Sequence, residues 1–331
     1  MPHRRRMIVS NTCYEVCFRA RSSLPFVAYR IIKLIIGAAV ARAQRDDKVV
    51  ICHDIWNGSH PHLILVAKDS LKFVQFYDEV QKKITDMLKR LLGLDYLSIW
   101  EGYPAVIELG DPDMVKDRIA YLYANPAQDN LVESIDQFPG YSSWEGFLSS
   151  KDRLSAMTEE EYPWIRLPSL PKLPSSVLTS NQDRNFVRII EKANKKKHKL
   201  VRHPNAWMKC FKVDSDQEVK EINDQIIEMI REREDEARNL RQLANRTVMG
   251  RVKLCSQEIL KPHTPKKREI KVFIMTTDNE LRMRKIEERD LFDELCRECY
   301  ESWKKGDYRC QWPPGAFKPP LPPTENLLPG W

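Results

Sequence analysis

The sequence has no hydrophobic run long enough to cross a membrane. Its longest apolar stretch, residues 31–40, reads IIKLIIGAAV and includes Lys33, whereas a spanning helix needs about 20 apolar residues. The basic start, MPHRRRM, is not followed by the apolar core of a signal peptide. We therefore expect a cytoplasmic protein with no membrane partner.

The sequence has eight cysteines in 331 residues. A cytoplasmic location would keep these thiols mostly reduced, so we expect no disulfide framework. Cys296 and Cys299 form a CxxC pair, with Cys255 and Cys310 at a distance, and such spacing occurs in zinc sites. The pair lies inside a predicted helix and no second tight pair exists, so whether it binds metal remains open.

The charge is modestly basic. A net charge of +7 and a pI near 8.9 fit a polyanionic partner without requiring one. Lys195, Lys196, Lys197 and Lys199 form a cluster, and Arg4, Arg5 and Arg6 form a basic N-terminal arm. We predict that both groups contact DNA, the arm by reaching a groove or a loop. A solvated surface is the alternative for the lysines.

The first 150 residues alternate between two kinds of pattern. Alternation of apolar residues and turn signals predict strands at 12–20, 49–53, 62–67 and 105–109. Helical spacing and capping residues predict helices at 29–45, 69–92 and 111–125, the last ending before Pro126. This order predicts an α+β sandwich in which helices pack on a mostly antiparallel sheet.

The rest of the chain has a different composition. Prolines punctuate residues 151–180, which we interpret as a linker. Residues 181–331 are basic and largely helical by pattern, with a long charged helix at 217–245 and a proline-rich tail. Trp207 and Phe211 alternate with lysines, so either stacking on bases or burial in a second core would explain them.

Two of the seven histidines stand two positions apart, in the stretch NGSHPHLILV at 57–66. Residues i and i+2 of a strand share a face, so His60 and His62 point the same way and can bind one divalent cation. A third ligand must come from elsewhere. Asn125 supplies an amide oxygen, and Tyr121 lies one helical turn before it. Tyr123 is the rival tyrosine, but it projects from another side of that helix.

Five short motifs occur in order: His60-Pro61-His62-Leu63, Trp100-Glu101-Gly102, Tyr121 to Pro126, Asn130-Leu131-Val132-Glu133, and Tyr141-Ser142-Ser143-Trp144. In this order the chain resembles the REP-associated tyrosine transposases, which are single-tyrosine HUH endonucleases. The resemblance covers residues 1–150 well and the remainder loosely. It implies an HUH-type, ferredoxin-like sandwich in residues 1–150, followed by the linker and the helical extension.

The resemblance also implies an activity. Tyr121 would be the catalytic nucleophile that attacks single-stranded, hairpin DNA and leaves a 5′-phosphotyrosine and a free 3′-hydroxyl. His60, His62 and Asn125 would hold Mg²⁺ or Mn²⁺, and Zn²⁺ is compatible with the same ligands. Members of the family act as monomers or homodimers, and the sequence does not distinguish these states or name the DNA target.

One departure from the family pattern keeps a second hypothesis open. A large hydrophobic residue usually separates the two histidines, and here it is Pro61. Proline lacks an N–H group, so a central strand would lose one ladder hydrogen bond there. The alternative to a transposase is therefore a catalytically inactive, repurposed DNA-binding protein of the same fold. An unrelated metal-binding scaffold is a third hypothesis.

Overall fold

The computed structural model describes residues 7–45, 49–264, 272–316 and 318–321. The strands are β1 Thr12–Cys17, β2 Ser23–Leu24, β3 Val49–Asn57, β4 His60–Ala67, β5 Ala105–Leu109, β6 Tyr141–Ser142, β7 Thr158–Pro163, β8 Lys197–Arg202, β9 Lys261–Pro262 and β10 Ile274–Met275. The helices are α1 Arg30–Gln44, α2 Ser70–Leu92, α3 Pro112–Gln128, α4 Trp144–Ser150, α5 Ser180–Ala193, α6 Asp216–Leu243, α7 Gly250–Leu254 and α8 Asn279–Lys304. Of the described helices, none is long and apolar enough to span a bilayer.

The centre of the protein is a mixed, mostly antiparallel sheet in the order β10-β5-β1-β4-β3-β8-β7, with β6 beside β3. Its middle four strands, β5-β1-β4-β3, are antiparallel to one another, whereas β10 and β8 join them in parallel. With α1 and α2 they follow the β-α-β-β-α-β order of a ferredoxin-like sandwich. The predicted α+β class and antiparallel core are therefore confirmed.

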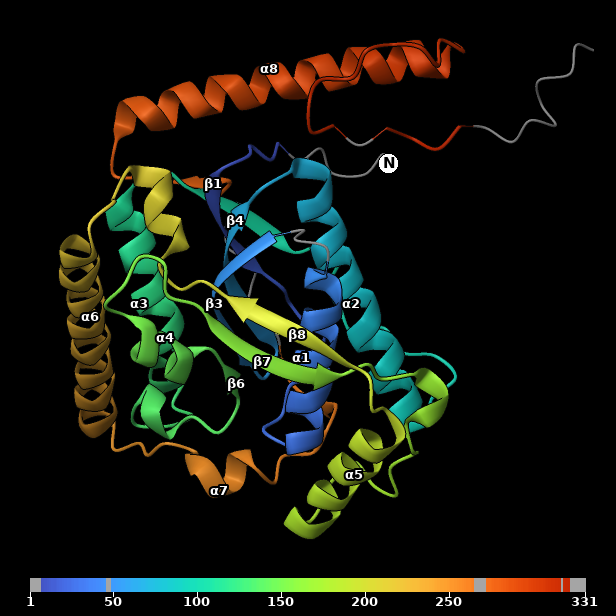
Figure 1. Ribbon diagram of the computed structural model, residues 1–331, viewed down its shortest axis with the longest axis vertical. Helices are drawn as coiled ribbons and strands as arrows, with labels where there is room; N and C mark the ends of the chain where they lie inside the picture. Colours follow the sequence, from blue (N-terminus) through green and yellow to red (C-terminus); the bar gives the residue numbers. More distant parts are fainter. Residues whose placement is uncertain (1–6, 46–48, 265–271, 317, 322–331) are drawn as a thin grey trace, which may run out of the picture.

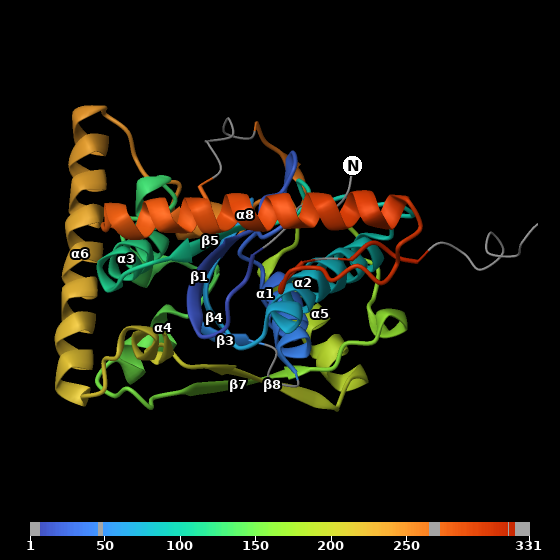
Figure 2. The same ribbon diagram turned by 90° about the horizontal axis from the view of Figure 1, so that it is seen from above.

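Helices cover both faces of this sheet (Figures 1 and 2). On one face α1 and α2 pack against Val16, Leu63 and Leu65. On the other face α3 and α4 share a core with Ile64 and Val66, and α6 packs on α3. Neighbouring residues of β4 thus belong to opposite cores, as the two-residue period of a strand requires.

The helix boundaries agree with the sequence where capping residues mark them. Asp69 accepts a hydrogen bond from the Lys72 amide at the start of α2, and Gly93 ends this helix in the left-handed conformation with a φ of 64°. Asp111 caps α3 in the same way. The predicted end of α3 at Asn125 is wrong, because the helix continues through Pro126 to Gln128. Pro126 and the residue after it are buried, so packing outweighs the local preference against proline.

Strand β3 is longer than predicted and contains a bulge. It runs to Asn57, and the register with β4 shifts between Ile51 and His53. A bulge inserts one extra residue and therefore reverses which later residues face each side. Beyond it, Ile55 pairs with His62 and Asn57 pairs with His60, so these four residues share the face that α3 covers.

The second half of the chain contributes to the same sheet. Strand β7 lies inside the segment predicted as a linker, and it pairs with β8, which pairs with β3. Residues 181–331 are mostly helical where described, but β8 makes this part an extension of the core sheet. Trp207 is fully buried in the core on the α3 side of the sheet, so burial, not base stacking, accounts for it. The three-part domain division itself stays a prediction.

One buried arginine joins the two halves. Arg202 at the end of β8 donates to Asp54 of β3 (2.6 Å), to Glu160 of β7 (2.6 Å) and to the Tyr141 hydroxyl (2.8 Å). Arg202 is 2% exposed and Asp54 is fully buried. Burying one such charge without the other is costly, so the pair forces β8 into one position against β3.

We predict that Arg202→Ala lowers the free energy of unfolding by about 3–5 kcal/mol, because it leaves the Asp54 carboxylate buried without its partner. Urea unfolding monitored by circular dichroism measures this. Lys199→Ala on the same strand is the matched control, since its pair with Glu159 is exposed to solvent and should matter little. Equal stability of the two variants would contradict the prediction.

Candidate active site

The two histidines of β4 lie on the face covered by α3. His60 and His62 alternate with Pro61 and Leu63, and Ile64 further along packs in the α3 core. The His60 and His62 ring centroids are 5.5 Å apart and nearly perpendicular. The strand thus brings both rings to one place, as the spacing predicts.

Pro61 fits this strand at small cost. It pairs with Trp56 of β3, and its carbonyl accepts a hydrogen bond from the Phe18 amide (3.0 Å). Phe18 lies just beyond the end of β1. The N–H that proline lacks would have pointed toward this same neighbour, so the missing bond falls at the edge of the β1–β4 ladder and not within it.

A buried carboxylate fixes the His62 ring. Glu15 of β1 is 1% exposed. It accepts a hydrogen bond from His62 Nδ1 (2.8 Å) and two from Arg118 of α3, from Nε (2.8 Å) and Nη2 (2.9 Å). With Nδ1 held in this way, Nε2 is directed to the other side of the ring, where Cys17 Sγ lies 3.9 Å away.

These contacts shift two pKa values in opposite directions. Burial would raise the pKa of Glu15, but His62 and Arg118 outweigh it and lower the pKa to about 2. Burial would lower the pKa of His62, but Cys17 and Glu15 outweigh it and raise the pKa well above its usual range. The lowered pKa of Glu15 and the raised pKa of His62 both favour an ionised carboxylate beside a protonated imidazole.

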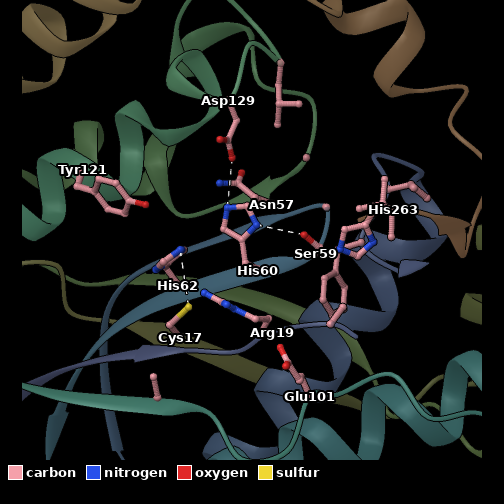
Figure 3. Close-up of a pocket in the computed structure, with 18 of the residues that line it drawn as sticks. Cys17, Arg19, Asn57, Ser59, His60, His62, Glu101, Tyr121, Asp129 and His263 are labelled. Carbon is pink, nitrogen blue, oxygen red and sulfur yellow. Dashed lines mark hydrogen bonds and ion pairs between the residues drawn. The ribbon is translucent and has the colours of Figure 1, made fainter. Parts of the chain in front are cut away.

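Tyr121 faces the same place from α3. Its ring packs edge-on against His62, with centroids 5.8 Å apart, and the Arg118 guanidinium lies 4.2 Å from the ring centroid. Figure 3 shows the Tyr121 hydroxyl directed into the space beside His60 and His62. A cation over an aromatic ring is favourable, so Arg118 holds both Glu15 and Tyr121 in position.

Tyr123, the rival tyrosine, lies elsewhere. It is fully buried, and its hydroxyl contacts His53 Nδ1 and Ser143 Oγ, each at 2.9 Å. Burial raises its pKa strongly. Tyr123 therefore belongs to the core between α3 and α4, and His53 is a structural residue of that core.

The side chain of Asn125 faces β3. Its side-chain oxygen accepts a hydrogen bond from Asn57 Nδ2 at 2.5 Å, and both residues are buried. One turn further along, Asp129 contacts His60, with its Oδ2 atom 3.3 Å from His60 Nε2. His60 Nδ1 in turn lies 3.2 Å from Ser59 Oγ. The structure thus brings together His60, His62 and Tyr121, with Asp129 as the additional side chain.

These residues line a cavity of about 670 Å³ at the ends of β1, β4 and α3. Its polar lining includes Arg19, His60, His62, Arg118, Tyr121 and Asp129. Sequence reasoning missed Glu15, Cys17, Arg118 and Asp129. A signal for Glu15 was present, because a carboxylate within the apolar strand TCYEVC needs a partner. Nothing in the sequence identified Arg118 as that partner.

The predicted metal site of His60, His62 and Asn125 stays a prediction. Asn125 is bonded to Asn57, and no group of three or more His, Cys, Asp or Glu side chains among the described residues is arranged to hold a metal ion. In the CxxC pair, Cys296 is buried and Cys299 Sγ contacts the Gln311 carbonyl. All eight cysteines are free thiols in the structure.

The predicted DNA-binding lysines lie on and beside β8, away from this cavity. Lys197 pairs with Glu161 (3.1 Å) and Lys199 with Glu159 (2.7 Å) on β7, whereas Lys196 lies 4.3 Å from the centre of the Trp164 ring. Lys195 is exposed. Arg4, Arg5 and Arg6 lie outside the described residues. DNA contact by these residues stays a prediction.

The pKa of Glu15 predicts how stability depends on pH. Because this pKa is lower in the folded than in the unfolded state, Glu15 stabilises the fold above about pH 4.5, and this stabilisation is lost as pH falls toward about 2. Urea unfolding should therefore show that the wild type has a higher free energy of unfolding than Glu15→Gln above about pH 4.5. This difference should become smaller as the pH falls from about 4.5 to about 2. A constant difference would contradict the assignment.

Comparisons with known proteins add one structural likeness. No protein-family model and no curated protein matches the chain. A solved structure described as a REP-associated tyrosine transposase bound to a REP hairpin is similar to it, with a TM-score of 0.38 and 17% sequence identity, over 45% of this chain and 86% of that chain. A likeness of this size carries no argument about activity, so what the chain does must be argued from its own residues.

Proposed function

We propose that the chain is a single-tyrosine DNA strand transferase with an HUH-type core, which nicks and rejoins single-stranded DNA through Tyr121. The observation that carries the proposal is the position of the Tyr121 phenol, which reaches the cavity lined by His60 and His62 from a different element. The β-α-β-β-α-β order of the core, with the two histidines on one strand and the tyrosine on a later helix, supports the same reading.

The proposed reaction is an exchange of phosphate esters. The Tyr121 oxygen forms a bond to phosphorus, the bond from phosphorus to the 3′ oxygen breaks, and the phenol proton ends on the released 3′-hydroxyl. Because the energy of the broken bond is kept in the 5′-phosphotyrosine, another 3′-hydroxyl can reverse the step and join a new strand. No other reactant is needed.

The cavity offers cationic groups to a phosphodiester, next to carboxylates. Arg19 and Arg118 line it together with Glu15, Glu101 and Asp129, and the raised pKa of His62 favours its protonated form. Arg118 is already bonded to Glu15, which fixes its guanidinium before a substrate arrives. Fixed positive groups stabilise negative charge that develops on the phosphate oxygens during the exchange.

The use of Mg²⁺ or Mn²⁺ stays a prediction. Two imidazoles face the cavity, but Asn125, the third predicted ligand, is engaged by Asn57, so we derive no step through a metal ion. The proposed assay is therefore run both with Mn²⁺ and with a chelator.

The second candidate is a DNA-binding protein of the same fold that lacks catalysis. The buried bond between Asn57 and Asn125 favours it, because this bond occupies the oxygen that the enzyme hypothesis assigns to the metal. The two candidates share a prediction of DNA binding and differ only in whether a covalent adduct forms.

We predict that the wild type forms a covalent adduct with a labelled single-stranded hairpin, seen as a shifted band on a denaturing gel, and that Tyr121→Phe forms none while binding the same DNA equally well. Removing the hydroxyl removes the nucleophile but little of the ring packing. Tyr96→Phe is the control, since Tyr96 is 80% exposed and lies outside the cavity.

The result separates the candidates. Binding without any adduct in the wild type supports the non-catalytic protein. An adduct that persists in Tyr121→Phe would overturn the assignment of the nucleophile. Absence of any binding to hairpin DNA at low salt would overturn both candidates.

A further inference from the structure

A second cavity of about 450 Å³ lies where the start of α1 meets α5 and α7. Figure 1 shows α5 and α7 near the same end of α1. Four cationic side chains line this cavity, Arg30 and Lys33 from α1, Arg184 from α5 and Arg251 from α7, and the single carboxylate in its wall belongs to Asp183. None of these residues is used by the site described above.

The carboxylate is engaged by backbone amides and forms no side-chain ion pair with Arg30, Lys33 or Arg251 among the described residues. Asp183 accepts hydrogen bonds from the backbone amides of Arg30 (2.8 Å) and Ile31 (2.9 Å) and so caps α1 in place of a local residue. Arg184 is held by Asn181 and the Ser180 carbonyl. No carboxylate pairs with Arg30, Lys33 or Arg251 among the residues that the structure describes.

The cations act on one another. The pKa of Lys33 is lowered, first by its partial burial and then by Arg30 and Arg251, while Cys255 and Asp183 oppose the shift. Like charges held around one cavity repel each other, and an anion placed among them would remove this cost. The cavity therefore has the chemistry of a site for a phosphate group.

This cavity adjoins the one that contains Tyr121. Ala28 lines both. Residues 138 and 140 line the first cavity and Pro139 lines the second, while α7 contributes Leu254 to the first and Arg251 to the second. A DNA strand that leaves the first cavity past residues 138–140 reaches the second within a short length of backbone.

We propose that the cavity formed by Arg30, Lys33 and Arg251 binds a backbone phosphate of the single strand that flanks the DNA held at Tyr121. The inference rests on the proposed function for the identity of the DNA. It assigns to this chain a strand path that bends from the α3 face of the sheet, around the end of α1, to α7.

The test measures affinity by fluorescence anisotropy for two labelled DNAs, a hairpin with a single-stranded tail and the same hairpin without it. Arg30→Gln/Arg251→Gln should bind the tailed DNA about tenfold more weakly, with a salt slope reduced by about 1.4, because each lost contact to a single strand contributes about 0.7. Binding of the hairpin without a tail should not change. Lys33→Gln should act in the same direction, which keeps the test valid if one of the variants is poorly folded.

The matched control is Lys220→Gln/Lys253→Gln, which removes two exposed positive charges from α6 and α7 outside the cavity. An equal loss of affinity in this control, or an unchanged affinity and salt slope in the cavity variant, would overturn the proposal. If inorganic phosphate raises the melting temperature of the wild type but not of the cavity variant, while both bind tailed DNA equally, the cavity takes free phosphate and the proposal is wrong.

The two proposals fail separately. A tail-dependent loss of affinity without any tyrosine adduct supports the phosphate site and counts against the strand transferase. An adduct at Tyr121 with tail affinity unaffected by the cavity variants supports the transferase and counts against the phosphate site.

Discussion

The site depends on one buried carboxylate. Glu15 receives three charged hydrogen bonds, one from His62 on β4 and two from Arg118 on α3, and so fixes a strand and a helix to a third element, β1. Leaving such a charge without partners inside a protein costs several kcal/mol, so the ring of His62 and the guanidinium of Arg118 have little freedom. Tyr121 packs between these two groups. Glu15 therefore sets the position of Tyr121 indirectly, through His62 and Arg118.

The same principle joins the two halves of the chain. Arg202 from β8 reaches Asp54 on β3, on the side of the sheet that faces away from α3. The bulge in β3 allows the strand to contribute to the cavity on one face and to the Arg202 pair on the other. Beyond it, Asn57 and Ile55 face α3, whereas Asp54 faces α1 and β8. One buried ion pair thus defines the position of the extension, while a separate buried carboxylate defines the cavity.

The sequence alone predicted the features that depend on residues close together in the chain. The caps Asp69, Gly93 and Asp111 marked two helices, and the spacing of His60 and His62 placed both rings on one face. It failed where a distant residue decides the outcome. Pro126 continues α3 because the core buries it, and Glu15 is fixed by Arg118, 103 residues further along the chain. Residues 158–163 form a strand only because they pair with β8. The sequence of the proline-punctuated segment itself gives no sign of this pairing.

The bond between Asn57 and Asn125 decides how the cavity should be understood. A hydrogen bond between neutral groups contributes about 0.5–1.5 kcal/mol net, which is small beside the free energy of binding a divalent cation or a charged strand. Asn57 Oδ1, moreover, has no hydrogen-bond partner within the described structure, so this pair is not a fully satisfied structural contact. The pair holds the site in its present geometry only weakly, and a ligand that bonds either amide more strongly than the two bond each other will separate them. The arrangement of Tyr121, His62, Arg118 and Glu15 does not share this weakness, since its contacts involve buried charges. The catalytic hypothesis therefore depends on contacts between buried charges, which hold Tyr121 in place. The metal hypothesis depends on Asn125, whose side chain is held by its weak hydrogen bond with Asn57.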